Sequence, residues 1–202
     1  MTTRNLDLGC GPVPRNPYGR DERCGVDLSG QVGQGAIRRA NLAMQPIPFD
    51  SDQFDSASAY DFLEHVPRVL PTADGLGTRF PFIELMNEVW RVLKPGGLFY
   101  AVTPVFPSAA AFMDPTHVNI MTADTHTHFT RPQRMATMYG FHGDFAVRRV
   151  QPTRPDPSRA YIAAPANVWQ RLRLAHRIRR GACGHLIWEF EVLKRAVPSF
   201  HS

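Results

Sequence analysis

Asn5-Leu6-Asp7-Leu8-Gly9-Cys10-Gly11 is the segment from which the architecture of this chain is best deduced. Two apolar residues flank an acid, and a Gly-x-Gly turn follows at once. This pattern predicts a short buried strand that ends in a tight turn, where glycine lets the backbone pass close to a ligand. Position 14 is proline, so the pattern is not the G-x-G-x-x-G fingerprint of NAD-binding proteins.

The residues that follow this turn are unusual because Pro12, Pro14 and Pro17 fall within six positions. Proline is not tolerated in the interior of an α-helix, so any helix after the first strand must be short or start late. A second strand is predicted over Cys24–Leu28, and it ends on the acid Asp27. A carboxylate at the carboxyl end of the second strand of a parallel sheet can hold a ribose diol, although a solvated loop aspartate is the alternative.

Three further elements follow at regular distances. A strand is expected over Ser56–Tyr60, and a helix is expected over Phe82–Leu93, where apolar residues recur at three- and four-residue spacing. Lys94-Pro95-Gly96-Gly97 carries the signals that end a helix. Leu98–Thr103 is almost continuously apolar, which is typical of a strand buried on both faces.

This order of elements resembles the class I S-adenosylmethionine-dependent methyltransferases, and in particular the small "type 11" methyltransferase domains. The resemblance implies an α/β fold, a three-layer Rossmann-like sandwich with a mostly parallel seven-stranded sheet and an antiparallel last strand. It covers about the first hundred residues. The motifs that carry it are Leu6–Gly11, Val26–Ser29, Pro46–Phe49 with Phe54-Asp55, Leu63-Glu64-His65-Val66 and Arg91–Gly97.

We expect one domain over residues 1–202, a length that suits a single α/β domain. Its cofactor half is expected to span 1–104, and a substrate-loop insert 104–132. A carboxyl-terminal strand pair with a basic helical insert is expected over 145–195, with strands at Phe145–Val150 and Leu186–Leu193.

The resemblance also implies how S-adenosylmethionine would be bound. Gly9 and Gly11 would let the backbone approach the methionine part of the cofactor. Asp7 would help to bind its amino group, directly or through water, and Asp27 would hold the ribose hydroxyls. Asn41 stands where the family usually has an acid, and its amide carbonyl would accept from the adenine amine. The implied cofactor site also includes Cys10, Leu28, Leu42 and Tyr60.

The proline-rich segment departs from the family, which normally starts a full helix there. A helix amino terminus for the cofactor carboxylate is therefore in doubt. Arg15 could supply the positive charge instead, or it could simply be solvated.

Substrate chemistry is expected in the inserts 67–81 and 104–132, because ligands of open α/β sheets bind beyond the carboxyl ends of the strands. Asp114-Pro115-Thr116-His117 resembles a segment of methyltransferase-like proteins in bacterial polysaccharide and glycolipid pathways. His117 could act as general base on a hydroxyl with Asp114 fixing its orientation. Alternatively, Asp114 and Pro115 only form a turn. His65 is the second candidate base.

A metal site would require more than the sequence pattern offers. In an extended segment His126 and His128 would share a face, and Asp124 is close by. No third and fourth ligand has diagnostic spacing, so we expect no metal.

Val168–Arg180 reads as a basic amphipathic helix, with five arginines around Trp169, Leu172, Ala175 and Ile178. It could contact an anionic membrane or a lipid-linked substrate. We prefer the alternative that its apolar stripe packs on the domain while the arginines are solvated.

Composition narrows the remaining classes of protein. The formal net charge is +5, but basic and aromatic residues are not interleaved as nucleic-acid binding would need. Three irregularly spaced cysteines, no room for a signal peptide after Met1 and no apolar run long enough to cross a bilayer indicate a cytoplasmic protein.

The function we expect is methyl transfer from S-adenosylmethionine to a small-molecule or glycan acceptor, at oxygen. Two alternatives stay open. One is a non-catalytic module that binds the cofactor or S-adenosylhomocysteine within a biosynthetic complex, and the other is a different nucleotide-binding α/β protein.

Overall fold

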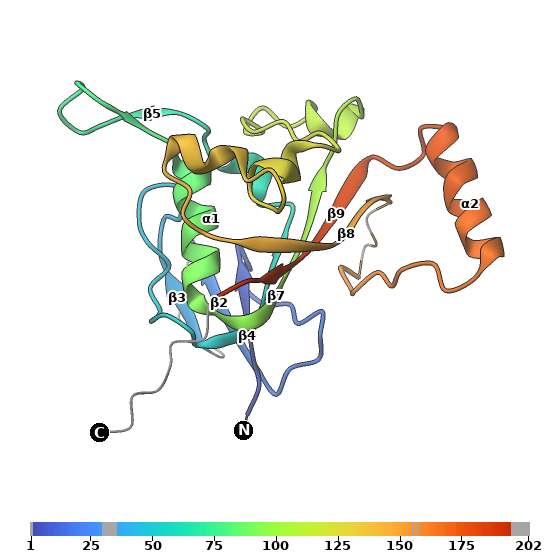
Figure 1. Ribbon diagram of the computed structural model, residues 1–202, viewed down its shortest axis with the longest axis horizontal. Helices are drawn as coiled ribbons and strands as arrows, with labels where there is room; N and C mark the ends of the chain where they lie inside the picture. Colours follow the sequence, from blue (N-terminus) through green and yellow to red (C-terminus); the bar gives the residue numbers. More distant parts are fainter. Residues whose placement is uncertain (1, 30–35, 155, 157, 195–202) are drawn as a thin grey trace.

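The computed structural model describes residues 2–29, 36–154, 156 and 158–194, so both ends of the expected domain lie outside the described residues. Its centre is one seven-stranded sheet with the order β3-β2-β1-β4-β7-β9-β8 (Figure 1). The strands are β1 Arg4–Leu8, β2 Glu22–Asp27, β3 Ala36–Arg39, β4 Phe54–Tyr60, β7 Leu93–Pro104, β8 Phe145–Thr153 and β9 His185–Val192.

The directions of the strands confirm the expected sheet. The five strands from β3 to β7 are parallel, and the last strand, β9, runs antiparallel to both of its neighbours, β7 and β8. In such a sheet the carboxyl ends of the parallel strands meet at one edge, where ligands bind.

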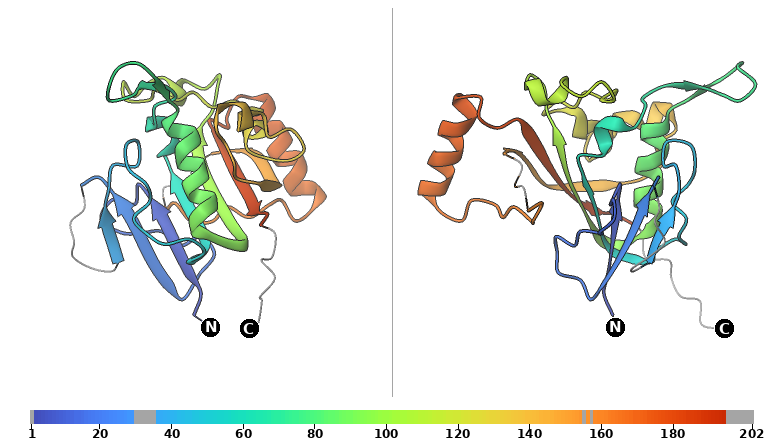
Figure 2. Two further views of the ribbon diagram at one scale, coloured as in Figure 1. Left: turned by 60° about the vertical axis from the view of Figure 1, so that its left-hand side comes forward. Right: turned by 180° about the vertical axis from the view of Figure 1, so that it is seen from behind.

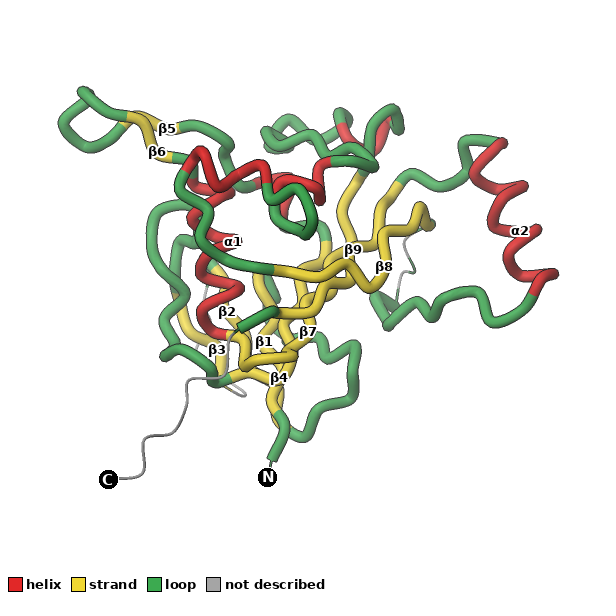
Figure 3. The backbone as a smooth tube through the Cα atoms, viewed as in Figure 1, coloured by secondary structure: helices red, strands yellow, loops and turns green. Residues whose placement is uncertain are grey.

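One face of the sheet is covered by helix α1, Pro81–Val92 (Figure 3). Its buried apolar residues form the predicted stripe, and Pro81 stands at the first helical position, where its missing amide hydrogen costs nothing. The helix ends beside Leu93, and the register of β4 on β7 shifts where Lys94–Gly97 pass. The predicted helix over Phe82–Leu93 is therefore correct to within one residue.

The opposite face is covered by loop segments. Tyr18, from the proline-rich loop, and Tyr161, from the chain after β8, pack on Tyr100 of β7, with ring centroids 6.2 and 5.2 Å away. Residues 12–21 contain no helix, as the three prolines predict. On this side the outer layer is thus formed by loops that pack aromatic side chains on the sheet, whereas many α/β folds have helices there.

The two inserts extend beyond the carboxyl ends of β4 and β7 (Figure 2). The first begins after the short helix η1, Leu63–His65, and contains the hairpin of β5, Leu70–Pro71, and β6, Thr78–Arg79. The second contains η2, Ala109–Ala111, and η3, Thr125–His128, and is followed by η4, Met135–Tyr139.

Helix α2, Val168–Arg179, forms where it was predicted, but its surroundings differ from those we preferred. Asn167 caps it by accepting from the Gln170 amide. No residue of the helix is buried, and Trp169 remains 76% exposed. The expectation that its apolar stripe packs on the domain is therefore wrong. Among the described residues no helix is long and apolar enough to span a membrane.

The core beneath α1 can be tested with Met86→Ala. Met86 is fully buried, so truncation leaves a cavity and should lower the free energy of unfolding by about 2–5 kcal/mol. Urea denaturation measures this change. The control Leu76→Ala removes a side chain that is 91% exposed and should change stability by no more than about 0.5 kcal/mol. Equal effects of the two variants would contradict this packing.

Candidate active site

The turn after β1 has the backbone conformation that glycine favours. Gly9 and Gly11 have φ values of 62° and 60°. A Cβ atom on Gly9 would lie 2.5 Å from Cδ2 of Phe62, so a side chain has no room there. The Gly9 amide donates to the Val26 carbonyl at 2.9 Å, which fixes the turn beside the end of β2.

Asp7 holds the proline-rich loop against the sheet. Its carboxylate is fully buried, accepts from the Ser58 hydroxyl and the Arg15 amide at 2.8 Å each, and lies 3.4 Å from Nη1 of Arg15. Burial raises the pKa of Asp7 to about 6, and the Arg15 contacts counteract this shift. The Asp7 carboxylate has no exposed surface, so its contact with a cofactor amino group, directly or through water, stays a prediction.

Arg15 lies against the glycine turn and Asp7. Its guanidinium contacts the Gly9 carbonyl at 3.5 Å and lies 5.3 Å from the ring centroid of Tyr60. Arg15 is therefore held in the glycine turn and is not a free, solvated side chain. A cation here suits the carboxylate of an amino-acid ligand.

Asp27 lies across the same turn. Its carboxylate accepts from the Gly11 amide at 2.8 Å and from the Ser29 amide and hydroxyl at 2.9 and 2.5 Å. Partial burial would raise the pKa of Asp27, but the hydrogen bonds from Ser29 and Gly11 lower it below the usual value. The group therefore stays an anion, and it lies at the carboxyl end of β2, where a ribose can be held.

The adenine side of the expected site lies in the turn after β3. The carbonyl of Asn41 accepts from the Ala43 amide at 3.1 Å, so it caps its own turn while keeping a second lone pair. Leu42 is buried in the core, so its side chain is not available beside a base. Leu28 is exposed after β2, where an apolar group could cover an adenosine.

Cys10 and Tyr60 complete the expected cofactor residues. Cys10 is buried against Gly25, and burial raises the pKa of its thiol to about 12, so it is not a nucleophile. The Tyr60 ring packs on Tyr100, and its hydroxyl is buried without a hydrogen-bond partner. Burial also raises the pKa of Tyr60, so the hydroxyl remains a donor.

These residues fit S-adenosylmethionine. The glycine turn has no room for a side chain at Gly9, whereas there is open space beside Gly11. Asp27 is an anion and Arg15 is a cation, so the turn carries both charges. The Tyr60 hydroxyl has no hydrogen-bond partner in the protein. A ligand with an amino-acid group and a ribose would contact both the Arg15 cation and the Asp27 anion.

A polar cavity of about 590 Å³ lies beyond the carboxyl ends of β4 and β7. It brings together the two predicted histidines and Asp114 with residues that are far apart in the sequence. Its polar lining consists of Asp61, Glu64, His65, Asp114, His117, Arg159 and His185.

His117 and Asp114 both lie in this cavity but are not hydrogen-bonded through their side chains. Nε2 of His117 is 4.0 Å from Oδ2 of Asp114 and 4.0 Å from Oε1 of Glu64. Asp114 instead accepts from the Thr116 amide at 2.8 Å and hydroxyl at 2.6 Å, which is the turn that we weighed as the alternative. The expectation that Asp114 orients His117 directly is therefore wrong in this structure.

Asp114 acts on His65 instead. The Thr116 hydroxyl donates its hydrogen to Asp114 and lies 2.9 Å from Nδ1 of His65. Thr116 must then accept from Nδ1–H, which leaves the lone pair of neutral His65 on Nε2. Asp114, Thr116 and His65 thus form a chain of hydrogen bonds that fixes a tautomer.

Glu64 is a site residue that the sequence analysis did not select. Its carboxylate is 2% exposed, Oε2 accepts from the Thr103 hydroxyl at 3.1 Å and Oε1 has no hydrogen-bond partner. Burial raises the pKa of Glu64 to about 7. Its own carbonyl accepts from the amides of Val118 and Asn119, both at 2.9 Å, so η1 is tied to the substrate insert.

Asp61 is a second missed residue. It lies 3.2 Å from Nε2 of His185 and 3.3 Å from Nη2 of Arg159. Burial acts to raise the pKa of Asp61, but its contacts with His185 and Arg159 lower it below the usual value. More than a hundred residues separate His185 from Asp61, so spacing in the sequence offered no signal for this pair.

The cavity also contains a group with metal-ligand spacing. One ligand atom from each of Glu64, His65 and His117 lies within 4.8 Å of the others. His126 and His128 do not belong to it. They lie on η3, a 3-10 helix, so the extended segment assumed for them is wrong and residues two apart do not share a face.

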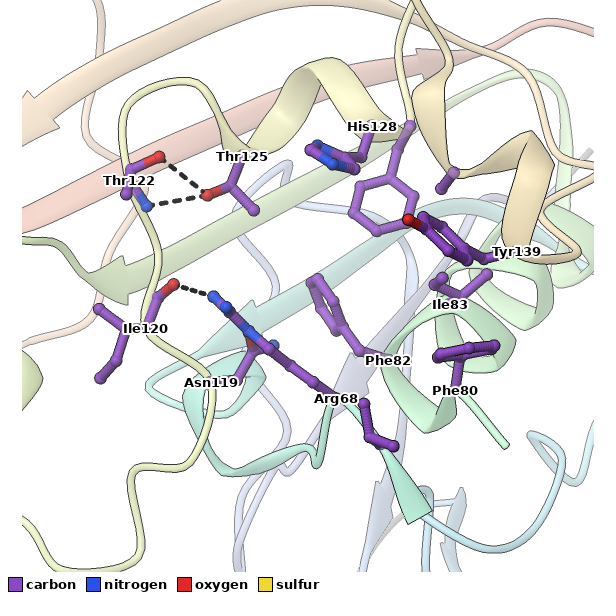
Figure 4. A pocket seen from close by; sticks show the side chains of 13 residues that line it. Arg68, Phe80, Phe82, Ile83, Asn119, Ile120, Thr122, Thr125, His128 and Tyr139 are labelled. Carbon is purple, nitrogen blue, oxygen red and sulfur yellow. Dashed lines mark hydrogen bonds between the residues drawn. The ribbon is translucent and has the colours of Figure 1, made fainter. Parts of the chain in front are cut away.

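A second cavity, of about 410 Å³, lies between α1, η3 and η4 and is mainly apolar (Figure 4). Phe80, Phe82, Ile83 and Tyr139 line it. At its rim Arg68 donates to the Asn119 side chain at 2.6 Å and to the Ile120 carbonyl. This cavity offers room for an apolar group beside η1.

The fold is that of an α/β protein whose ligand site is expected at the carboxyl edge of its sheet. Comparison with known proteins indicates which class of α/β protein this chain resembles. Residues 6–101, just under half of the chain, match the family model described as a methyltransferase domain. These residues are similar to methyltransferase domains, and the chain shares its fold with S-adenosylmethionine-dependent methyltransferases.

Solved structures share this fold at low sequence identity. An S-adenosylmethionine-dependent methyltransferase from Mesorhizobium loti matches with a TM-score of 0.52 and 17% identity, over 94% of this chain and 91% of that chain. The complex of the Haloferax volcanii Trm112 methyltransferase activator with a methyltransferase contains a match with a TM-score of 0.56 and 15% identity, over 96% and 84%.

The fold is shared with an enzyme of another kind as well. The [4+2]-cyclase SpnF matches with a TM-score of 0.53 and 16% identity, over 96% of this chain and 76% of that chain. A search of the curated proteins finds no similar sequence.

The role of Asp27 can be tested with Asp27→Ala. The variant loses an anion that would accept from ribose hydroxyls, so the affinity for S-adenosylhomocysteine should fall at least about tenfold by calorimetry. Asp50→Ala, which removes an exposed acid bonded only to Gln53 among the described hydrogen bonds, serves as the control and should bind normally. Unchanged affinity in the Asp27 variant would refute the ribose assignment.

The raised pKa of Glu64 predicts a stability that depends on pH. The folded protein holds the Glu64 proton up to about pH 7, whereas the unfolded chain loses it near pH 4.5, so this group destabilises the fold as pH rises through that window. Neutral Glu64→Gln should therefore be more stable than the parent protein at pH 8, by up to about 3 kcal/mol. The difference should vanish near pH 4, as measured by urea denaturation. A difference that does not change with pH would contradict the shift.

Proposed function

We propose that this protein transfers a methyl group to a hydroxyl of a small-molecule or saccharide acceptor. The observation that supports this proposal is the polar cavity with two histidines beyond β4 and β7, next to the cofactor turn. When bound, S-adenosylmethionine supplies an activated methyl group on a sulfonium. The remaining tasks belong to the protein: it must position the acceptor and remove the hydroxyl proton.

His117 is the proposed base. Its side chain is nearly buried, and the carboxylates of Glu64 and Asp114 lie 4.0 Å from its Nε2. The Asp114 carboxylate, whose pKa is lowered by its hydrogen bonds from Thr116, stays an anion and stabilises the imidazolium that forms when His117 takes a proton. His65 is the second candidate, because the hydrogen-bond chain from Asp114 through Thr116 leaves the lone pair on its Nε2.

Asp61 and Arg159 are suited to positioning the acceptor. They lie on one wall of the cavity with His185, and they offer acceptors and donors to a polyhydroxylated molecule. The apolar cavity of Figure 4 is lined in part by Asn119, whose side chain donates to the Leu63 carbonyl of η1. An acceptor with a saccharide part and an apolar part would use both cavities.

His117→Ala tests the base. Turnover with a hydroxyl acceptor should fall about 10²–10⁴-fold, which is the usual contribution of a positioned base, while calorimetry should show normal affinity for S-adenosylhomocysteine. His65→Ala and Thr116→Val, measured in parallel, test the second candidate and its hydrogen-bond chain. If only the His65 and Thr116 variants lose turnover, the base is His65.

The same assay separates proton transfer from two other roles of this cluster. Turnover that a chelator abolishes and zinc or manganese restores would reassign Glu64, His65 and His117 as metal ligands. Normal cofactor binding without transfer to any acceptor of a hydroxyl panel would favour the non-catalytic binding module. The fold alone cannot decide this point, since it also hosts a cyclase.

A further inference from the structure

We propose that residues 158–184, which we name the basic arm, bind an anionic lipid surface and thereby bring a membrane-held acceptor to the cavity. The inference rests on the proposed function for the acceptor, but binding of the arm to lipid can be tested by itself.

The arm exposes apolar side chains that a solvated helix does not need. Figures 1 and 2 show α2 standing away from the sheet. Trp169 and Leu172 are 76% and 56% exposed, and Val168 and Ile178 are exposed as well. Val168, Trp169, Leu172 and Ala175 follow one another at helical spacing, so they form one apolar stripe. Among the described residues nothing covers this stripe.

The charge of the arm indicates what kind of partner the apolar stripe contacts. Six arginines and no acidic residue lie between Pro157 and Trp188. The whole chain has a formal net charge of +5, so the rest of the chain is close to neutral. The positive excess is thus concentrated in the arm, and five of its six arginines lie at 171–180, in or directly after α2. Arginine and tryptophan around an apolar face are typical of helices that lie in the interface of an anionic bilayer.

The helix is suited to lying on a membrane and not to crossing it. It has 12 residues, whereas a span needs about 20. The long arginine side chains can reach lipid phosphates while their methylene groups remain against the acyl chains. An RNA partner would also meet the charge, but it would leave the aliphatic residues Leu172 and Ile178 unexplained.

Both stems of the arm belong to the catalytic cavity. Arg159 at its beginning pairs with Asp61, and His185 directly after its end contacts the same carboxylate. The Val105 amide donates to the Gly184 carbonyl at 3.0 Å, so the second stem is also tied to the substrate insert. That insert exposes Phe106, Phe112 and Met113, which extend the apolar surface beside the cavity. A bilayer that holds the arm would therefore lie near the cavity entrance.

Vesicle binding of the full chain, without cofactor or acceptor, tests the proposal. We expect flotation with vesicles of phosphatidylcholine and phosphatidylglycerol, and no flotation with phosphatidylcholine alone. The most exposed tryptophan is Trp169, so its emission should shift to shorter wavelength on binding. Trp169→Phe should still bind but lose that shift, which places the helix itself in the interface.

Two variants separate the apolar and the charged contributions. Trp169→Ser with Leu172→Ser removes the stripe, and Arg171→Gln, Arg173→Gln, Arg177→Gln and Arg179→Gln together remove four charges. Each basic residue near an anionic surface contributes about fivefold, so the second variant should bind at least about a hundredfold more weakly. Leu76→Ser and the double variant Arg23→Gln with Arg39→Gln change exposed residues elsewhere and should bind normally.

The outcomes keep this proposal distinct from the proposed function. Absence of vesicle binding, or binding that the arm variants leave unchanged, overturns the lipid surface, whatever the enzyme methylates. Self-association of the free protein that is lost in the Trp169 and Leu172 variant would also overturn it and assign the stripe to a second copy. Two results together support both the lipid surface and the proposed function. The first is vesicle binding that the arm variants lose as expected. The second is that His117→Ala is inactive on a water-soluble hydroxyl acceptor while the arm variants are active on it. Vesicle binding without any methyl transfer supports the arm and refutes the proposed function.

Discussion

The buried carboxylate of Asp7 is the contact on which the cofactor side of this fold depends. A fully buried acid is costly unless donors surround it, and here they come from Ser58 on β4 and from the amide and guanidinium of Arg15. The same interaction joins β1, β4 and the proline-rich loop. Because the prolines exclude a helix after β1, this contact does what a packed helix does in related folds. It fixes the glycine turn and places a cation beside it.

The substrate side depends on an analogous contact at η1. The Glu64 carbonyl accepts two amides of the insert, and the Asn119 side chain donates to the Leu63 carbonyl. Arg68 adds two more hydrogen bonds to residues 119 and 120. These contacts hold His117 close to Glu64 and His65, although more than 50 residues of chain separate them. The position of His117 in the cavity is thus determined by these hydrogen bonds between η1 and the insert, and not by the Asp114 pair that the sequence suggested.

Much of the fold could be predicted because its signals are local. Periodic apolar residues define α1, proline and glycine end it, and continuous apolar runs define β7 and β9. Asp27 and the glycine turn were found for the same reason, since strand ends and tight turns are read over a few residues. Arg159 and His185 were not selected, because only the tertiary fold brings them to Asp61 and Glu64. Asp61 and Glu64 are near His65 in the sequence, but only their burial and partners in the fold set them apart as candidate catalytic groups. The side chain of Leu42 lies in the core, so its place beside an adenine stays a prediction.

The exposure of α2 shows a different limit of prediction from the sequence. An amphipathic pattern indicates that a helix has an apolar face, but it does not indicate what covers that face. In a folded domain the usual cover is the domain's own core, and this is why packing was the preferred expectation. Here the chain leaves the sheet after Thr153 and returns at His185, and the arm between them has an exposed stripe and no acidic residue of its own. A surface of this composition is stable in water mainly because its arginines keep it solvated. The charge that keeps the arm soluble is then also what directs it toward an anionic partner next to the catalytic cavity.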